Sequence, residues 1–212
     1  MRIGLTGGIG SGKSTVGAML VQQHRATLVD TDAIARQLTL PGGAAMPTVA
    51  QAFGTALVGA DGGLDRAAMR ALVFSDPGAK RRLEAILHPL IGAEAMRQAQ
   101  KARGAVVFDV PLLAESSHWR DRVDRVLVVD CLEATQLVRV TQRPGWTEQT
   151  ALAVIEQQAS RRLRRECADA VIYNDGLSLE QLAKELQPLC LRWFLPHRAG
   201  PIEGLAVEQS VP

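Results

Sequence analysis

The chain has 212 residues, 47% of them hydrophobic and 22% charged, with 24 basic and 22 acidic side chains. This composition is typical of a globular protein, and a net charge of +2 provides no global attraction to nucleic acid. No apolar run approaches the length of a membrane span, so we expect no membrane partner. The three cysteines lie far apart without C-x-x-C spacing, which indicates neither a zinc site nor a disulfide framework and favours a cytoplasmic protein.

The first predicted elements are a short buried strand over residues 2–6 and a helix over residues 16–23. Between them, GGIGSGKST (residues 7–15) contains the pattern G-x-x-x-x-G-K-[ST]. Glycine permits the dihedral angles that turn several backbone N–H groups toward one phosphate, and the following helix presents its positive end. The segment therefore predicts a nucleotide-phosphate site made by Gly8, Gly10, Ser11, Gly12, Lys13, Ser14 and Thr15.

Two side chains of this segment have separate predicted roles. Lys13 adds a positive charge near the β- and γ-phosphates, and Ser14 offers a hydroxyl to Mg²⁺. The pattern alone does not distinguish a kinase from an ATPase or a GTPase. The chain contains neither D-x-x-G nor N-K-x-D, which argues against a GTP-dependent switch.

A second predicted strand, residues 26–30, ends in Asp30-Thr31-Asp32, where a helix is expected to start. Carboxylates at the end of a parallel strand face the ligand crevice of an α/β sheet. We interpret Asp32 as the group that orients a substrate hydroxyl or accepts its proton, and Asp30 as a weaker candidate for the same work. The alternative for Asp32 is that it caps the helix.

Residues 44–102 are predicted to be almost wholly helical, with turns at residues 60–63 and 76–78. Because no strand is expected in this stretch, we interpret it as an insertion on the sheet. His88 precedes Pro89, and a histidine in this position is expected to end a helix.

Three further strands are predicted at residues 104–111, 125–130 and 170–173, with a last helix over residues 178–194. Strands that alternate with helices predict an α/β fold with a doubly wound, five-stranded parallel sheet. Its ligand edge collects Asp109 and Asn174. Asp109 ends an apolar strand, where a carboxylate that binds Mg²⁺ would be expected. The alternative is that Asp109 is a strand-end residue with no role in Mg²⁺ binding.

The segment between the last two strands, residues 132–167, is helical and basic, with Arg139, Arg143 and the run Arg161–Arg165. It has three interpretations: a solvated helix face, a nucleic-acid patch or a lid over a nucleotide. The run Arg161–Arg165 contains no aromatic residue and its charge is local, so we expect no nucleic-acid partner. The concentration of basic charge between the last two strands favours the lid. The tail from residue 195 onward lacks periodicity and is expected to be loosely ordered.

In chain order, these motifs resemble the dephospho-CoA kinase family over residues 2–190. The combination of D-x-D-x-x-A-R with H-P and P-L-L-x-E is more specific for this family than the glycine-rich segment of residues 7–15, which we call the phosphate loop. The matching segments are GGIGSGKST (7–15), DTDAIAR (30–36), LHPLI (87–91), VPLLAE (110–115), Gln142-Arg143 and ADAVIYNDG (168–176).

The resemblance implies ATP- and Mg²⁺-dependent phosphorylation of the ribose 3′-hydroxyl of dephospho-CoA, on a P-loop NTPase fold. It implies a nucleotide-binding core (1–31, 104–131, 168–194), a helical acceptor-binding insertion (32–103) and a lid (132–167). Carried over by position, Asp32 is the residue at the acceptor hydroxyl, Arg143 the lid arginine at ATP, and Asn174 the adenine contact. The residues implied to border the acceptor are Arg36, His88, Pro111, Leu112 and Glu115.

The chain departs from the family pattern at Ala114, Thr31 and Pro144-Gly145, the last of which leaves the geometry of the lid open. Two alternative functions remain at this point. One is another small-molecule P-loop kinase, for a nucleoside monophosphate or a small alcohol, and the other is a nucleotide-gated binding protein without acceptor-stimulated turnover. We expect a monomer or a weak homo-oligomer.

Overall fold

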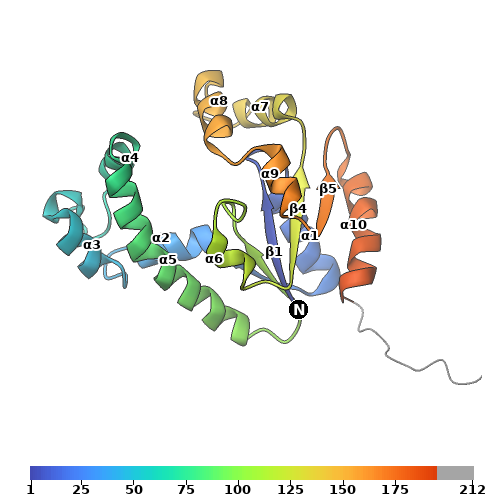
Figure 1. Ribbon diagram of the computed structural model, residues 1–212, viewed down its shortest axis with the longest axis horizontal. Helices are drawn as coiled ribbons and strands as arrows, with labels where there is room; N and C mark the ends of the chain where they lie inside the picture. The colour runs from blue at the N-terminus through green and yellow to red at the C-terminus, as the bar shows by residue number, and fades with distance from the viewer. Residues whose placement is uncertain (195–212) are drawn as a thin grey trace, which may run out of the picture.

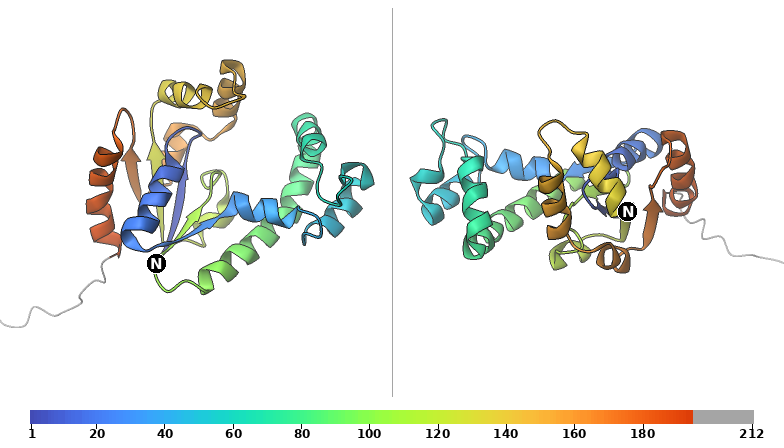
Figure 2. Two further views of the ribbon diagram at one scale, coloured as in Figure 1. Left: turned by 180° about the vertical axis from the view of Figure 1, so that it is seen from behind. Right: turned by 90° about the horizontal axis from the view of Figure 1, so that it is seen from above.

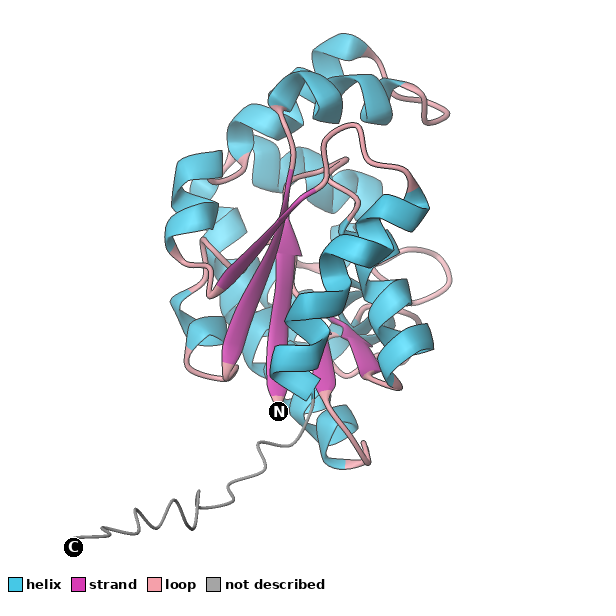
Figure 3. Ribbon diagram, turned by 90° about the vertical axis from the view of Figure 1, so that its right-hand side faces the viewer, coloured by secondary structure: helices cyan, strands magenta, loops and turns pink. Residues whose placement is uncertain are grey.

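The computed structural model describes residues 1–194, so the predicted tail over residues 195–212 lies outside the described residues. A central sheet has helices on both faces and beyond its carboxyl end (Figure 1, Figure 3). Among the described residues, no helix combines the length and the apolar composition needed to cross a bilayer.

The sheet has five parallel strands in the order β2-β3-β1-β4-β5, which confirms the predicted doubly wound topology. The strands are β1 (Arg2–Gly7), β2 (Thr27–Asp30), β3 (Val106–Asp109), β4 (Arg125–Asp130) and β5 (Ala170–Tyr173). After the central β1 the chain forms β2 and β3 on one side of it and then β4 and β5 on the other. The topological switch therefore lies at the carboxyl end of β1. Asp30 and Asp109 are register partners at the ends of neighbouring strands.

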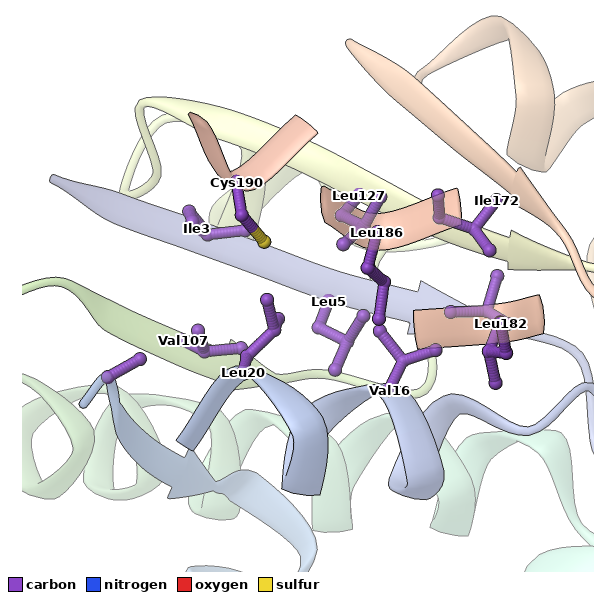
Figure 4. Packing of buried hydrophobic residues seen from close by; sticks show 12 residues of the cluster. Ile3, Leu5, Val16, Leu20, Val107, Leu127, Ile172, Leu182, Leu186 and Cys190 are labelled. Atoms are coloured by element: carbon purple, nitrogen blue, oxygen red, sulfur yellow. The ribbon is translucent and has the colours of Figure 1, made fainter. Parts of the chain in front are cut away.

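One face of the sheet is covered by α1 (Lys13–His24) and α10 (Leu179–Phe194) (Figure 4). Val16 and Leu20 of α1 pack with Leu182 and Leu186 of α10 in one buried cluster that also contains Leu5 of β1. Since the segment after β1 leads straight into α1, this packing fixes where the helix begins relative to the sheet. The phosphate loop therefore connects two elements of one core.

The cysteines Cys131 and Cys190 are buried, and burial raises the pKa of each thiol to about 11. Both therefore stay protonated at neutral pH and pack as small apolar side chains. Cys167 is half-buried, and burial raises its thiol pKa as well.

The predicted insertion is helical and extends away from the sheet (Figure 2). It comprises α2 (Thr31–Leu38), α3 (Met46–Phe53), the short 3₁₀ turn η1 (Thr55–Leu57), α4 (Arg66–Ser75) and α5 (Pro77–Gln100). Val49 and Met69 are the buried centre of a small cluster of its own, against which α5 packs Leu83 and Leu87. The second half of α5 returns to the sheet, where Ala95 is buried with Phe108.

The expectation that His88 ends a helix is wrong, because α5 continues through Pro89 to Gln100. A proline inside a helix removes one backbone hydrogen bond and costs about 3 kcal/mol. Leu87 and Leu90, which flank Pro89 in the sequence, both pack in the insertion's cluster, and this packing offsets the cost. His88 is thereby held in the middle of a long helix, facing the end of the sheet rather than a turn.

The remaining helices are α6 (Ser117–Arg120), α7 (Glu133–Thr141), α8 (Glu148–Gln157) and α9 (Arg161–Glu166). In Figure 1, α7 and α8 lie beyond the carboxyl end of the sheet, where the lid was predicted. The run Arg161–Arg165 is not a uniformly solvated face. Arg161 makes a two-pronged ion pair with the buried Asp130 at 3.0 and 2.8 Å, and Arg164 is 5% exposed.

Candidate active site

The phosphate loop follows β1 at the topological switch of the sheet. Gly10 and Gly12 have φ angles of 76° and 95°, a left-handed conformation that glycine adopts without strain. Lys13 begins α1, whose first turn carries no acidic residue, so its free N–H groups and positive end meet no competing anion from its own first turn. The geometry is that of an anion site, as the sequence predicts.

Lys13 forms an ion pair with Asp109, which ends β3 beside β1. The two side chains are 15% and 10% exposed. Burial raises the pKa of Asp109 above its ordinary value, and the Lys13 ammonium opposes that shift. The neighbouring carboxylates Asp30 and Asp32 raise this pKa as well. A cation and three carboxyl groups thus converge at the end of the sheet.

Asp30, the last residue of β2, and Asp32, in the first turn of α2, have different surroundings. Asp30 is the N-cap of α2 and accepts a hydrogen bond from the Ala33 N–H at 2.8 Å, so the alternative that Asp32 caps this helix is wrong. Asp32 is exposed in the first turn of α2. The Thr31 hydroxyl donates to the Asp109 carbonyl at 2.7 Å, which ties the start of α2 to the end of β3. Asp32 is thereby held next to the Lys13–Asp109 pair with its carboxylate accessible.

Asp32 lines a cavity of about 120 Å³ between the end of β3, α2 and α5. Three of the residues that the resemblance assigns to the acceptor, His88, Pro111 and Leu112, are in its lining. The full lining is Thr31, Asp32, Ala35, His88, Ile91, Val110, Pro111, Leu112, Ser116 and Trp119. The structure therefore brings the predicted hydroxyl-orienting carboxylate and most of the predicted acceptor residues together.

Trp119 and Ser116 are site residues that the sequence did not reveal. Trp119 is 8% exposed and packs against Phe108, with 5.4 Å between ring centroids. Its segment has no periodic pattern, and one tryptophan there is equally consistent with a core residue. Its proximity to P-L-L-x-E was the only available signal.

A second cavity of about 230 Å³ adjoins the first and shares His88, Ser116 and Trp119 with it. His118 and Arg122 complete its polar lining, which contains no carboxylate. The Arg122 guanidinium lies over the Trp119 ring at 5.6 Å and against Gly92 of α5, where any larger residue would displace it. The two adjoining cavities have linings that change from acidic beside Asp32 to cationic beside Arg122.

Other predicted residues lie outside these linings. Arg36 is exposed and lies 3.8 Å from Asp30, and Glu115 accepts a hydrogen bond from the Ala159 N–H at 2.7 Å. Arg143 is exposed just beyond α7. Their substrate contacts stay predictions. Glu115 ties the acceptor side of the sheet to the segment that precedes α9.

Asn174, which follows β5, is 5% exposed and donates to the Ser11 carbonyl at 2.8 Å. Asn174 therefore holds the backbone of the phosphate loop at Ser11. Its predicted contact with adenine stays a prediction. Arg139 of α7 also reaches the loop, with its Nη1 3.3 Å from the Gly10 carbonyl oxygen.

The described residues contain no group of three or more His, Cys, Asp or Glu side chains placed to hold a metal ion. Mg²⁺ needs few protein ligands, because it retains waters and binds through substrate phosphates. Ser14 is exposed at the start of α1, and Asp109 contributes oxygens at the same edge. This oxygen-only donor set suits Mg²⁺ bound together with a triphosphate.

Comparison with known proteins agrees with this geometry. The family model CoaE, described as dephospho-CoA kinase, matches residues 1–180. Dephospho-CoA kinase of Burkholderia pseudomallei is 57% identical over 193 residues, which cover 91% of this chain and 95% of the relative. A solved structure from Thermus thermophilus is 34% identical with a TM-score of 0.79, covering 91% of this chain and 97% of that one. Dephospho-CoA kinase from Campylobacter jejuni, 23% identical with a TM-score of 0.66 and covering 91% and 96%, shares the fold.

Proposed function

This chain belongs to the dephospho-CoA kinase family, and we propose that it performs the family's reaction between Lys13 and Asp32. The reaction phosphorylates dephospho-CoA to coenzyme A and uses ATP. The observation that supports our assignment of the site is the Thr31–Asp109 hydrogen bond, which holds Asp32 beside the Lys13–Asp109 pair. The donor and acceptor sites thereby share one edge of the sheet.

On the donor side, backbone N–H groups of residues 12–15 and the positive end of α1 receive the phosphates of ATP, while the Ser11 N–H closes the loop by donating to the Gly8 carbonyl at 3.0 Å. Lys13 neutralises charge on the β- and γ-phosphates, and this charge shifts toward the bridging oxygen as the bond breaks. Mg²⁺ bound by ATP with Ser14 and Asp109 would supply further charge neutralisation at the phosphates.

On the acceptor side, the ribose of dephospho-CoA occupies the smaller cavity with its 3′-hydroxyl at Asp32. The 3′-oxygen forms a bond to the γ-phosphorus, and the bond from that phosphorus to the β,γ-bridging oxygen breaks. ADP leaves with the electron pair, and the hydroxyl proton passes to the Asp32 carboxylate. Asp32 is exposed in the first turn of α2, which makes its carboxylate accessible to the acceptor.

The predicted domains have a physical role in this scheme. The insertion over residues 32–103 contributes one wall of the acceptor site through α2 and α5. Residues 132–167 form the lid, and its connection between α7 and α8 carries Arg143, which reaches the nucleotide on closure and excludes water. We place the protein in the cytoplasm as a monomer or weak homo-oligomer.

The second cavity accommodates the diphosphate of dephospho-CoA beside His88, His118 and Arg122. A cationic lining without a carboxylate suits this group, and the Arg122 guanidinium is positioned by Trp119 and Gly92. Adenosine carries the same 3′-hydroxyl but no diphosphate. We therefore expect this cavity to favour dephospho-CoA over a plain nucleoside as the acceptor.

We expect Arg122→Gln to raise the KM for dephospho-CoA about tenfold, because one charge-assisted hydrogen bond is lost. The KM for ATP and the kcat/KM for adenosine stay within about twofold of wild type on the same reasoning. ADP release coupled to NADH oxidation measures all three. Arg70→Gln, at an exposed position of α4 outside both linings, is the matched control. If Arg122→Gln lowered kcat/KM equally for dephospho-CoA and for adenosine, the assignment of the diphosphate to this cavity would be wrong. The assigned reaction would not be affected by that result.

A further inference from the structure

The tip of the phosphate loop is held from outside by two glutamines of the predicted lid segment. The Ile9 N–H donates to Gln158 Oε1 at 2.9 Å, and Gln136 Nε2 donates to the Ile9 carbonyl at 2.7 Å. The two glutamines are 149 and 127 residues away from Ile9 in the chain. Both polar groups of one loop residue are therefore bound by side chains, and the Ile9 N–H is not available to donate to a phosphate.

The surroundings of the two glutamines are closely packed. Gln136 is 1% exposed on the loop-facing side of α7, and Gln158 caps the carboxyl end of α8. Arg164 of α9 is 5% exposed with its Nη2 2.8 Å from the position that a Gly8 Cβ would take. A side chain at Gly8 would also collide with the Gln136 amide. The loop thus lies against a preformed wall that only glycine can approach so closely.

We infer that Gln136 and Gln158 are positioning residues for phosphoryl transfer, which act through the two peptide groups that flank Ile9. Fixing both peptide groups fixes the direction of the chain into Gly10, whose φ of 76° begins the turn toward the phosphates. The N–H groups that follow are then aimed before ATP arrives, and preorganised donors lose little free energy to reorganisation when charge moves. The inference rests on the proposed function of this loop as the ATP site.

The two glutamines have opposite hydrogen-bonding roles, and this difference gives a sharp test. Gln158 supplies an acceptor, so Gln158→Glu keeps the bond to the Ile9 N–H. Gln136 supplies a donor, so Gln136→Glu loses the bond and places carboxylate oxygens against the Ile9 carbonyl. Methionine at either position preserves length and flexibility and removes the hydrogen bond.

We expect Gln136→Met and Gln158→Met each to weaken Mg·ADP binding roughly tenfold by calorimetry, as one lost hydrogen bond to a preorganised loop implies. In steady-state assays the KM for ATP rises and kcat falls by similar factors, while the KM for dephospho-CoA stays within about twofold. Gln158→Glu retains Mg·ADP binding within about threefold, whereas Gln136→Glu loses at least as much as Gln136→Met. Gln157→Met, at an exposed neighbouring position, leaves every constant unchanged.

The inference is overturned if the two methionine variants bind Mg·ADP as tightly as wild type. It is also overturned if glutamate has the same effect at both positions, or if the variants lose thermal stability and active fraction with unchanged constants. Because Mg·ADP binding needs no acceptor, these outcomes are independent of whether dephospho-CoA is phosphorylated. If Gln136→Met fails to fold, the two variants at the half-buried Gln158 still test the inference. It predicts that Gln158→Met weakens Mg·ADP binding and that Gln158→Glu retains it.

Discussion

Lys13→Ala lowers kcat with saturating ATP and dephospho-CoA by about 10³-fold or more, with the circular dichroism spectrum of wild type. The substitution removes the one full positive charge that the described residues place directly in the phosphate loop, beside the buried Asp109. In a site that excludes water, such a charge stabilises the transition state by several kcal/mol, and each ~1.4 kcal/mol corresponds to a factor of ten in rate.

The substitution also leaves Asp109 buried without its cation. Burial already raises the pKa of this carboxyl in the wild type, and loss of Lys13 raises the pKa further. A carboxyl with a raised folded-state pKa contributes stability at low pH and loses it as the pH rises through that pKa. The Tm of Lys13→Ala therefore falls more steeply than that of wild type as the pH rises above the ordinary carboxyl range.

Lys80→Ala, on the exposed face of α5, is the matched control and keeps wild-type kcat. If Lys13→Ala retained a tenth or more of wild-type turnover with an intact fold, the loop lysine would have no part in the transfer.

Asp32→Asn lowers kcat by about 10²- to 10⁴-fold, the range expected when a group that orients a nucleophile and accepts its proton is neutralised. The KM for ATP stays within about threefold, because Asp32 lines the acceptor cavity rather than the loop. Initial rates over a matrix of both substrate concentrations separate the two effects.

Asp30→Asn is the control two residues away. Asparagine caps a helix as well as aspartate does, so α2 keeps its N-cap and kcat changes little. Retained turnover in Asp32→Asn, or an equal loss in Asp30→Asn, would assign the acceptor-side role to another carboxylate, with Asp109 the next to examine.

The strand–loop–helix unit was predictable because glycines and one lysine at fixed spacing are a local signal. The doubly wound sheet followed from the alternation of strands and helices, and its parallel order placed Asp30 and Asp109 at one edge. Which of Asp30 and Asp32 caps α2, and which leaves its carboxylate accessible, was not predictable, since either side chain can cap a helix. The Ala33 hydrogen bond to Asp30 decides it.

The errors of sequence interpretation have physical causes as well. His88 was expected at a helix end because proline opposes helix continuation locally, whereas packing of Leu87 and Leu90 outweighs that preference. The arginine run was open to interpretation as a solvated face because charge alone reveals neither the buried Asp130 nor the wall behind Gly8. Gln136 and Gln158 contact the loop across more than a hundred residues, and no local pattern signals such a contact.

The alternative functions left open by the sequence differ in which acceptor is phosphorylated and in whether any acceptor is phosphorylated at all. Family membership favours dephospho-CoA over a nucleoside monophosphate or a small alcohol, and a kinase over a binding protein without turnover. The central claim is more specific: Asp32 directs the ribose 3′-hydroxyl at a γ-phosphate held by Lys13.

ADP release with dephospho-CoA and with its 3′-deoxy analogue tests this claim most directly. Both molecules carry the adenine, the diphosphate and the pantetheine arm, and only one has the hydroxyl that Asp32 is assigned to orient. We predict rapid ADP release and a 3′-phosphorylated product with dephospho-CoA, and only the basal rate seen without acceptor with the analogue. Equal stimulation of ADP release by the two molecules would contradict the claim.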